Sequence, residues 1–316
     1  MTSTPAGGGE RGTTRSYRLC GLKFDSDFDL PALPQWDGLP DAPADVNCRL
    51  GEVPARLGRP DHIAPLFQTS GTGEYLLVLP GTGRVRVRNG SEITVEPETG
   101  DATVNLSAIL SDPILAVLWH QRGLLPLHAS VVVFNGRAVA LCGPAAVGKS
   151  TLAAILAGQG YQVIADGICV VDMHGSEDVL VPSGRTRLQL WRDALTELGI
   201  ATDGLERALP HKERYFLDCG NGIAAQPYRL AAVVQVIRGA LPPAALERLR
   251  GSQTADVLYG CVHSPRPAKA LGRTQPIFAA IMGMSSAGVG VWHLKVPEGL
   301  AGVREAAVKL AAALEG

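Results

Sequence analysis

A nine-residue stretch near the middle of the chain has the spacing most closely tied to chemistry. It runs Gly143-Pro144-Ala145-Ala146-Val147-Gly148-Lys149-Ser150-Thr151 and fits the pattern G-x-x-x-x-G-K-[ST] at every fixed position. Glycines in such a loop let backbone N–H groups close around phosphate oxygens, and a helix N-terminus behind the loop favours negative charge. Lys149 is expected to reach the β- and γ-phosphates of a nucleotide, and the Ser150 hydroxyl is expected to hold Mg²⁺.

The residues on either side supply the context that this pattern requires. Residues 138–142 are expected to form a buried strand that enters the loop, and residues 151–157 are good helix formers that Gly158 and Gly160 end. The alternative is a chance glycine-rich turn, and the flanking strand and helix argue against it. The stretch therefore predicts nucleotide binding.

A hairpin before the loop places a histidine at the same site. Residues 124–134 and 137–142 are expected to be strands joined across Asn135-Gly136, a strong hairpin signal. If Phe134 faces Arg137, His128 lies opposite Gly143. The alternative is a core histidine satisfied by backbone groups, because a slip of one residue would turn the side chain away.

A carboxylate follows the next expected strand. Residues 161–164 should run parallel to the loop strand, and Asp166 then stands at the carboxyl end, where open α/β sheets bind ligands. A carboxylate there can hold Mg²⁺ or accept a proton from an attacking hydroxyl. The alternative is an aspartate that caps a turn before Gly167.

Further cations are candidate contacts to phosphates or to an acidic substrate. They lie in the basic segment 185–187 and at Lys212 and Arg214, just ahead of a short expected strand over 215–217. Solvated loop charge is the alternative for these residues. The row formed by Arg84, Arg86 and Arg88 alternates along another expected strand, which favours a solvated strand face over a phosphate-binding ladder.

Length and composition exclude several classes of function. The chain has 316 residues and a formal net charge of −1, so nothing in its overall charge favours binding to nucleic acid or to a membrane surface. Its apolar stretches are too short or too interrupted to span a bilayer. The six cysteines lie far apart without metal-ligand spacing, so we expect reduced thiols in a cytoplasmic protein.

The whole chain is predicted to be an α/β protein with two domains. Residues 1–16 are typical of a disordered tail, and residues 17–100 are expected to form a small β-rich domain that begins with one strand over 17–24. Residues 101–316 are expected to hold the loop in a mixed sheet with the antiparallel hairpin beside it. Helices are expected over 105–121, 192–198, 240–280 with proline breaks, and 303–314.

These motifs together resemble a known kinase family. The run Leu127-His128-Ala129-Ser130, the Asn135-Gly136 hairpin, the loop at 143–151 and Ile164-Ala165-Asp166 are similar to the catalytic core of HPr serine kinase/phosphorylase. The wider layout, which includes Leu190-Trp191-Arg192-Asp193, looks closer to the HPr-kinase-like proteins found beside peptide-modification genes, among them lasso-peptide kinases. The resemblance implies a P-loop kinase core of the HPr-kinase type behind the β-rich domain.

The resemblance also implies roles for particular residues. The 143–151 loop, with Lys149, would bind the phosphates of ATP, and His128 would lie at the reaction centre. Ser150 and Asp166 would hold Mg²⁺. The glycine- and glutamate-containing signature that the bifunctional enzyme carries beyond this core is missing, which argues against phosphorylase activity.

One position departs from the family pattern. The family has two adjacent aspartates, of which the second abstracts the proton, and this chain has Gly167 in that second place. Either Asp166 takes over as the base, with His128 polarising it, or turnover is slow or absent.

Two functional hypotheses follow from these residues. The first is an ATP- and Mg²⁺-dependent kinase that phosphorylates a hydroxyl, that of serine or threonine, on a peptide or small protein, as in lasso-peptide maturation. The second is an ATP-binding regulatory protein with little or no turnover because of Gly167. A motor-type ATPase is disfavoured by the antiparallel hairpin before the loop. Kinases of this family often assemble into oligomers, whereas the residues themselves indicate no oligomeric state.

Overall fold

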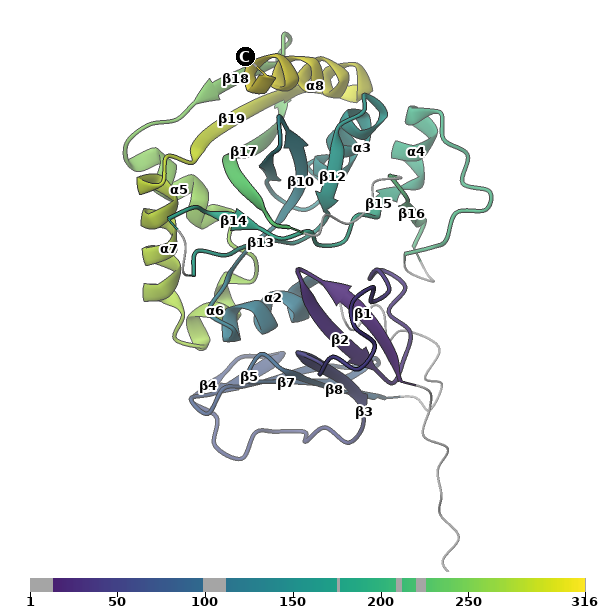
Figure 1. Cartoon of the computed structure of the whole chain (residues 1–316), viewed down its shortest axis with the longest axis vertical. Helices are drawn as coiled ribbons and strands as arrows, with labels where there is room; N and C mark the ends of the chain where they lie inside the picture. The colour runs from purple at the N-terminus through teal and green to yellow at the C-terminus, as the bar shows by residue number, and fades with distance from the viewer. Residues whose placement is uncertain (1–13, 99–111, 175–176, 209–211, 220–225, 316) are drawn as a thin grey trace, which may run out of the picture.

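The computed structural model describes residues 14–98, 112–174, 177–208, 212–219 and 226–315 of the chain. Two sheets organise it, one in each half of the sequence (Figure 1). The protein is mixed α/β, as the sequence predicts. The expected tail over residues 1–16 falls almost wholly outside the described residues.

The N-terminal sheet has eight strands in the order β1-β2-β3-β8-β7-β6-β5-β4. Its strands are β1 (Arg15–Leu19), β2 (Leu22–Ser26), β3 (Val46–Leu50), β4 (His62–Ile63), β5 (Phe67–Ser70), β6 (Glu74–Leu79), β7 (Gly83–Arg88) and β8 (Glu92–Pro97). Strands β7 and β8 form a hairpin across Asn89-Gly90, with Arg88 paired to Glu92.

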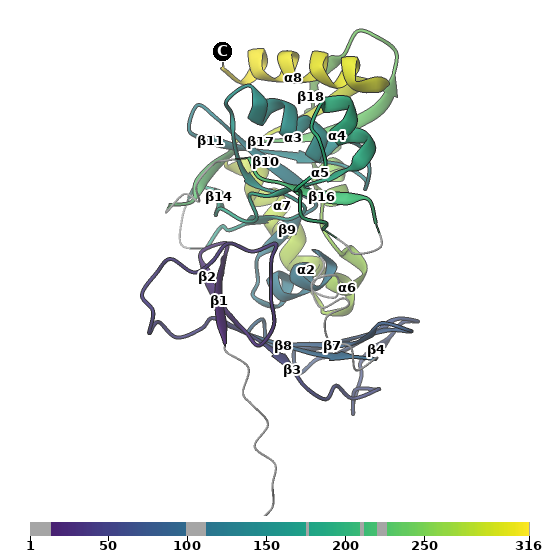
Figure 2. The same ribbon diagram turned by 90° about the vertical axis from the view of Figure 1, so that its right-hand side faces the viewer.

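The single strand predicted over 17–24 is wrong, because this segment is a hairpin. Strands β1 and β2 pair antiparallel, and Cys20 and Gly21 turn the chain with φ of +51° and +80°. Tyr17 and Leu19 alternate at odd positions, whereas Leu22 and Phe24 alternate at even positions, so the apolar pattern shifts by one residue at this turn. The prediction of one continuous strand overlooked that shift. The hairpin rises from the sheet toward the other half of the molecule (Figure 2), where the Cys20 N–H donates to the Ser183 carbonyl at 3.1 Å.

The arginine row on β7 is matched by acids of the neighbouring strands. Arg84 pairs with Glu96 at 2.8 Å, and Arg88 lies 3.5 Å from Glu74. Arg86 lies 4.0 Å from the same glutamate. Cross-strand pairing of this kind is typical of a half-solvated strand face, which is the interpretation that the sequence favours.

Helix α2 (Asp112–Gln121) lies between the N-terminal sheet and the rest of the molecule (Figure 1). Its apolar residues belong to the same hydrophobic cluster as the sheet, and Trp119 contacts the Phe24 ring edge-on with 6.5 Å between centroids. Pro113 occupies the first turn, where its missing N–H costs no hydrogen bond. The helix predicted over 105–121 is confirmed from Asp112 onward, and its earlier part lies outside the described residues.

The second sheet is mixed and contains the predicted hairpin. Its main strands are β10 (Ala129–Phe134), β11 (Arg137–Cys142), β12 (Gln162–Ala165), β17 (Tyr228–Ala240), β18 (Ala245–Arg248) and β19 (Gly290–Pro297), and β14 (Leu180–Val181) pairs with β17. The spatial order is β12-β10-β11-β17-β19-β18, with β11, β17 and β19 parallel. Strand β12 runs in the same direction as β11, as predicted, although β10 lies between them.

Two groups of helices cover the two faces of this sheet. On one face lie α3 (Lys149–Gly158), α4 (Arg192–Leu198) and α8 (Gly299–Glu315), and on the other lie α5 (Ser252–Gly260), α6 (Pro265–Ala270) and α7 (Thr274–Ser286). The helical prediction over 240–280 is wrong at β18, because the run Ala-Leu-Glu-Arg pairs with β19 and this pairing overrides its helix propensity. None of the described helices is both long and apolar enough to cross a membrane.

Two short pairs of strands complete the fold around the sheet's carboxyl edge. Strand β9 (Leu125–Leu127) pairs with β13 (Cys169–Val171), and β15 (Leu188–Trp191) pairs with β16 (Arg214–Leu217). The strand predicted over 124–134 is therefore two strands, which break at His128 because β9 pairs with β13 and β10 pairs with β11.

Candidate active site

The 143–151 loop joins β11 to α3 with a backbone that needs its glycines. Gly143 and Gly148 have φ of +144° and +98°, in the region that side chains disfavour. A β-carbon on Gly143 would also lie 3.0 Å from the Val236 carbonyl oxygen. The glycine spacing of the motif is thus explained by local geometry, and helix α3 begins directly at Lys149.

Lys149 is folded into this loop. Its side chain is buried, and the ammonium donates to the carbonyl oxygens of Gly143 and Pro144, both at 2.9 Å. Burial lowers the pKa of Lys149, and the nearby Asp166 carboxylate opposes that shift. A phosphate oxygen at the loop would find this cation already positioned.

Asp166 is the most densely hydrogen-bonded side chain of the site. It follows β12 and accepts hydrogen bonds from the Ser130 hydroxyl at 2.6 Å, the Ser150 hydroxyl at 2.9 Å and the Gln189 N–H at 3.0 Å. Only 4% of the residue is exposed. Three donors compensate the charge of this buried carboxylate and fix it beside the Ser150 hydroxyl.

His128 lies at the break between β9 and β10 and lines the same cavity as Lys149. The hairpin register predicted from Asn135-Gly136 is confirmed by the pairs Phe134–Arg137 to Ala129–Cys142, which end one residue after His128. Burial lowers the pKa of His128 and the Lys149 charge acts in the same direction, while nearby carboxylates oppose it. The lowered pKa favours the neutral form of the imidazole.

Asp112 is a residue of this site that the sequence did not single out. It begins helix α2, lines the cavity, and forms an ion pair with the buried Arg185. The same guanidinium donates to the Asp166 carbonyl oxygen at 3.0 Å. In the sequence Asp112 resembles an ordinary acidic residue before a helix-starting proline, and only the packing of α2 brings it to the loop.

The backbone at Gly167 explains why the chain has no side chain there. Its φ is +85°, and a β-carbon added to it would overlap the Asp112 carboxylate and the Arg185 guanidinium. The space beside Asp166 is thus filled by an ion pair contributed from two other segments.

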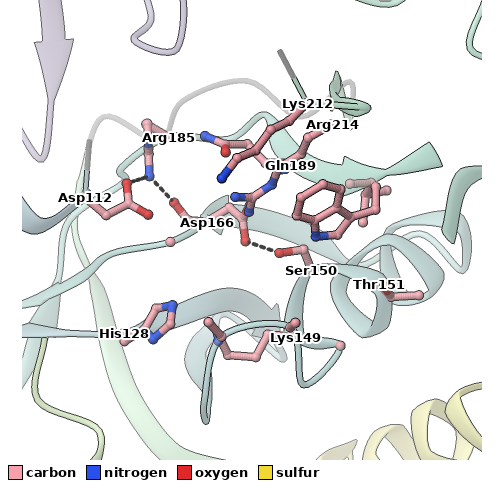
Figure 3. Close-up of a pocket in the computed structure, with 16 residues that line it drawn as sticks. Asp112, His128, Lys149, Ser150, Thr151, Asp166, Arg185, Gln189, Lys212 and Arg214 are labelled. Carbon is pink, nitrogen blue, oxygen red and sulfur yellow. Dashed lines mark hydrogen bonds and ion pairs between the residues drawn. The ribbon is translucent and has the colours of Figure 1, made fainter. Parts of the chain in front are cut away.

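One cavity of about 340 Å³ unites these groups (Figure 3). The structure brings Lys212 and Arg214 into its lining, and the Arg214 guanidinium lies 5.9 Å from the centroid of the Trp191 ring. Four cationic side chains and two carboxylates line it, namely Lys149, Arg185, Lys212 and Arg214 with Asp112 and Asp166. This charge balance suits a polyanion.

The protein side chains alone do not form a cage for a metal ion. Among the described residues, no group of three or more His, Cys, Asp or Glu side chains is placed to hold a metal. A cation at Ser150 and Asp166 would need oxygens from a ligand, which is how Mg²⁺ is commonly bound beside phosphates.

The chain has only a weak structural likeness to known proteins. The chain matches no protein-family model and no curated protein. Among solved structures it is similar to the HPr(Ser) kinase/phosphatase from Coxiella burnetii, at 13% identity and a TM-score of 0.29, over 60% of this chain and 99% of that chain. A likeness this weak carries no weight for the function of the chain.

Proposed function

We propose that the chain is a phosphotransferase that moves the γ-phosphoryl group of ATP, with Mg²⁺, to a hydroxyl. The observation that carries this proposal is the convergence of the 143–151 loop, Asp166 and His128 on one cavity from separate segments of the chain. The excess of cations in the cavity supports a triphosphate ligand.

The loop supplies the phosphate-binding groups. Its backbone and the N-terminus of α3 favour negative charge, and the Lys149 ammonium would exchange its carbonyl partners for phosphate oxygens. Lys212 and Arg214 lie across the cavity and would contact the outer oxygens of the triphosphate or an acidic acceptor.

Ser150 and Asp166 fit a magnesium site shared with the phosphates. One hydroxyl and one carboxylate lie 2.9 Å apart, and Mg²⁺ usually takes one or two protein ligands with the rest from phosphate and water. When bound, the ion would neutralise charge on the transferred group.

The proton of the attacking hydroxyl needs an acceptor, and the cavity offers three. Asp166 already accepts three hydrogen bonds, which suits a fixed orienting role. We infer that Asp112 accepts the proton, with His128 as a neutral helper. In this arrangement a second carboxylate stands beside Asp166 although residue 167 is glycine.

The second candidate is an ATP-binding regulatory protein. The ion pair between Asp112 and Arg185 favours it, because the Arg185 guanidinium already engages the carboxylate that would have to receive the proton. Such a protein would bind ATP at the same loop and transfer no phosphate.

The identity of the substrate that supplies the accepting hydroxyl is a further part of this function. We propose a serine or threonine of a peptide or small protein, as in lasso-peptide maturation, acting in the cytoplasm. Support comes from the resemblance of the sequence motifs, and the six free thiols fit a reducing compartment.

The test combines ATP binding with label transfer. Purified protein is titrated with ATP in a calorimeter, then incubated with γ-labelled ATP, Mg²⁺ and a cell extract or a peptide encoded beside its gene. Lys149→Ala should abolish both readouts while the circular dichroism spectrum stays native. Tight ATP binding without any transfer would favour the regulatory protein, and unchanged binding in Lys149→Ala would reject the loop as the phosphate site.

A further inference from the structure

We infer that a second cavity beside the 143–151 loop holds the base and ribose of the nucleotide, and that it selects nucleoside triphosphates over inorganic polyphosphate. This inference rests on the proposed function of the loop. The second cavity has about 330 Å³ and is lined by residues of α3, α4, β17 and α8.

The two cavities meet at the start of α3. Both are lined by Ala146, Gly148, Thr151 and Trp191. The reacting end of a triphosphate is fixed in the first cavity, because Lys149 and Asp166 line only that one. The other end of the ligand must then leave past Thr151, which leads into the second cavity.

The walls of the second cavity offer apolar surface for a planar base. Leu300 and Val303 contribute from the first turns of α8, and Ala194 faces them from α4. The Trp191 indole stands at the junction of the two cavities, and 42% of this residue is exposed. An aromatic ring and aliphatic side chains of this kind are the usual partners of a nucleobase.

The charges of the second cavity argue against a phosphate chain there. Its lining has two carboxylates, Asp193 and Glu197, and one guanidinium, Arg238, whereas cations outnumber carboxylates in the first cavity. Carboxylates repel phosphate but accept hydrogen bonds from the hydroxyls of a ribose. The change in charge between the cavities therefore matches the change from triphosphate to sugar along a nucleotide.

Arg238 adds an independent observation. It follows Val236 by two positions on β17, so both side chains face the side of the sheet that α3 and α8 cover. Its Nη1 atom is buried and has no hydrogen-bond partner among the described residues, and its Nη2 atom lies 3.9 Å from Glu298. A buried donor without a partner is costly, and a ring nitrogen, a sugar oxygen or the α-phosphate would satisfy it.

The experiment compares two ligands that share a triphosphate. ATP and inorganic tripolyphosphate are titrated into the full chain with Mg²⁺ present, in a calorimeter. We expect ATP to bind about 10- to 100-fold more tightly, as stacking and hydrogen bonds to a nucleoside provide elsewhere.

Variants on α4 then locate the selectivity. Ala194→Trp should fill the cavity and weaken ATP binding at least about tenfold, with tripolyphosphate binding unchanged. Thr196→Trp, on the exposed side of the same helix, is the control and should alter neither affinity. Glu197→Gln, at an exposed position, tests the sugar contact without adding bulk and should weaken ATP alone.

Each outcome bears on the inference. Equal wild-type affinities for the two ligands would overturn it and leave the phosphate site in place. Failure of both ligands to bind would overturn the proposed function, and this inference with it. The inference is also wrong if Glu197→Gln and a natively folded Ala194→Trp bind ATP like the wild type.

Discussion

The carboxylate of Asp112 occupies the space that a side chain on Gly167 would need. Gly167 has a φ of +85°, and its missing β-carbon would overlap both Asp112 and the Arg185 guanidinium that pairs with it. The position at which the sequence lacks a second aspartate is therefore, in the fold, filled by a carboxylate from helix α2.

Removing the charge at Asp112 should therefore stop the chemistry and spare binding. Asp112→Asn is expected to lower phosphate transfer by about 10²- to 10⁴-fold, the usual effect of losing a general base, while the ATP affinity changes little. Label transfer and calorimetry measure the two. Asp41→Asn, an exposed acid in the N-terminal half, is the control. Transfer at the wild-type rate in Asp112→Asn would show that the proton goes elsewhere.

A carboxylate at residue 167 should lower the stability of the otherwise unchanged protein. Gly167→Asp forces a side chain into left-handed backbone and into the Asp112–Arg185 pair, so we expect a loss of at least about 1–2 kcal/mol in the free energy of unfolding. Urea denaturation measures it.

In an Asp112→Ala background, Gly167→Asp should place a new carboxylate close to where the Asp112 carboxylate was removed. The double variant is expected to transfer more phosphate than Asp112→Ala alone. A double variant that folds but is no more active than Asp112→Ala would argue against a role for a second carboxylate at this position.

The two serines that donate to Asp166 allow the metal site to be tested with a matched pair. Ser150→Ala should raise the Mg²⁺ concentration needed for half-maximal activity, because the hydroxyl is a proposed ligand. Ser130 makes the shorter bond to the same carboxylate oxygen, at 2.6 Å, but does not line the cavity. If Ser130→Ala moves the Mg²⁺ titration as far as Ser150→Ala does, both serines merely orient Asp166.

The free energy of unfolding should fall at acidic pH because His120 is buried. This residue is buried at the end of α2, its Nε2 lies 2.8 Å from the His263 carbonyl oxygen, and burial lowers its pKa from 6.5 to about 4. The unfolded chain then binds the proton first as the pH falls, so stability present above pH 6.5 is lost toward pH 4.

Urea titrations at several pH values measure this slope. Removing the imidazole with His120→Gln should reduce it by up to about 1.4 kcal/mol per pH unit. His263, whose pKa burial also lowers to about 4, should keep part of the slope in that variant. An unchanged slope would mean that His120 takes no part.

Features set by neighbouring residues could be predicted from the sequence. The Asn135-Gly136 turn fixed the pairing of Phe134 with Arg137, and helix α4 begins at Arg192 and ends before Gly199 as expected. In these cases the residues that form the feature are adjacent in the chain, so local propensity and turn chemistry are sufficient.

Features set by distant contacts could not be predicted. Strand β18 has a helix-forming composition and becomes a strand only because β19 offers an edge. Asp112 reaches Arg185 because helix α2 packs into the hydrophobic cluster of the N-terminal sheet. The residues of that cluster are distant in the sequence, so the residues around position 112 do not predict the contact. The contribution of Gln189, whose backbone N–H donates to Asp166, has no signature in the type of its side chain.

Helix α2 also limits where recombination could divide this chain without disrupting its fold. Ile114, Leu118 and Trp119 are packed into the N-terminal core, while Asp112 on the same helix faces the cavity. A recombination that replaced the eight-stranded sheet but kept this helix would mismatch its apolar surface and displace the carboxylate. Sheet and helix would have to be inherited as one block, with the breakpoint falling after Gln121.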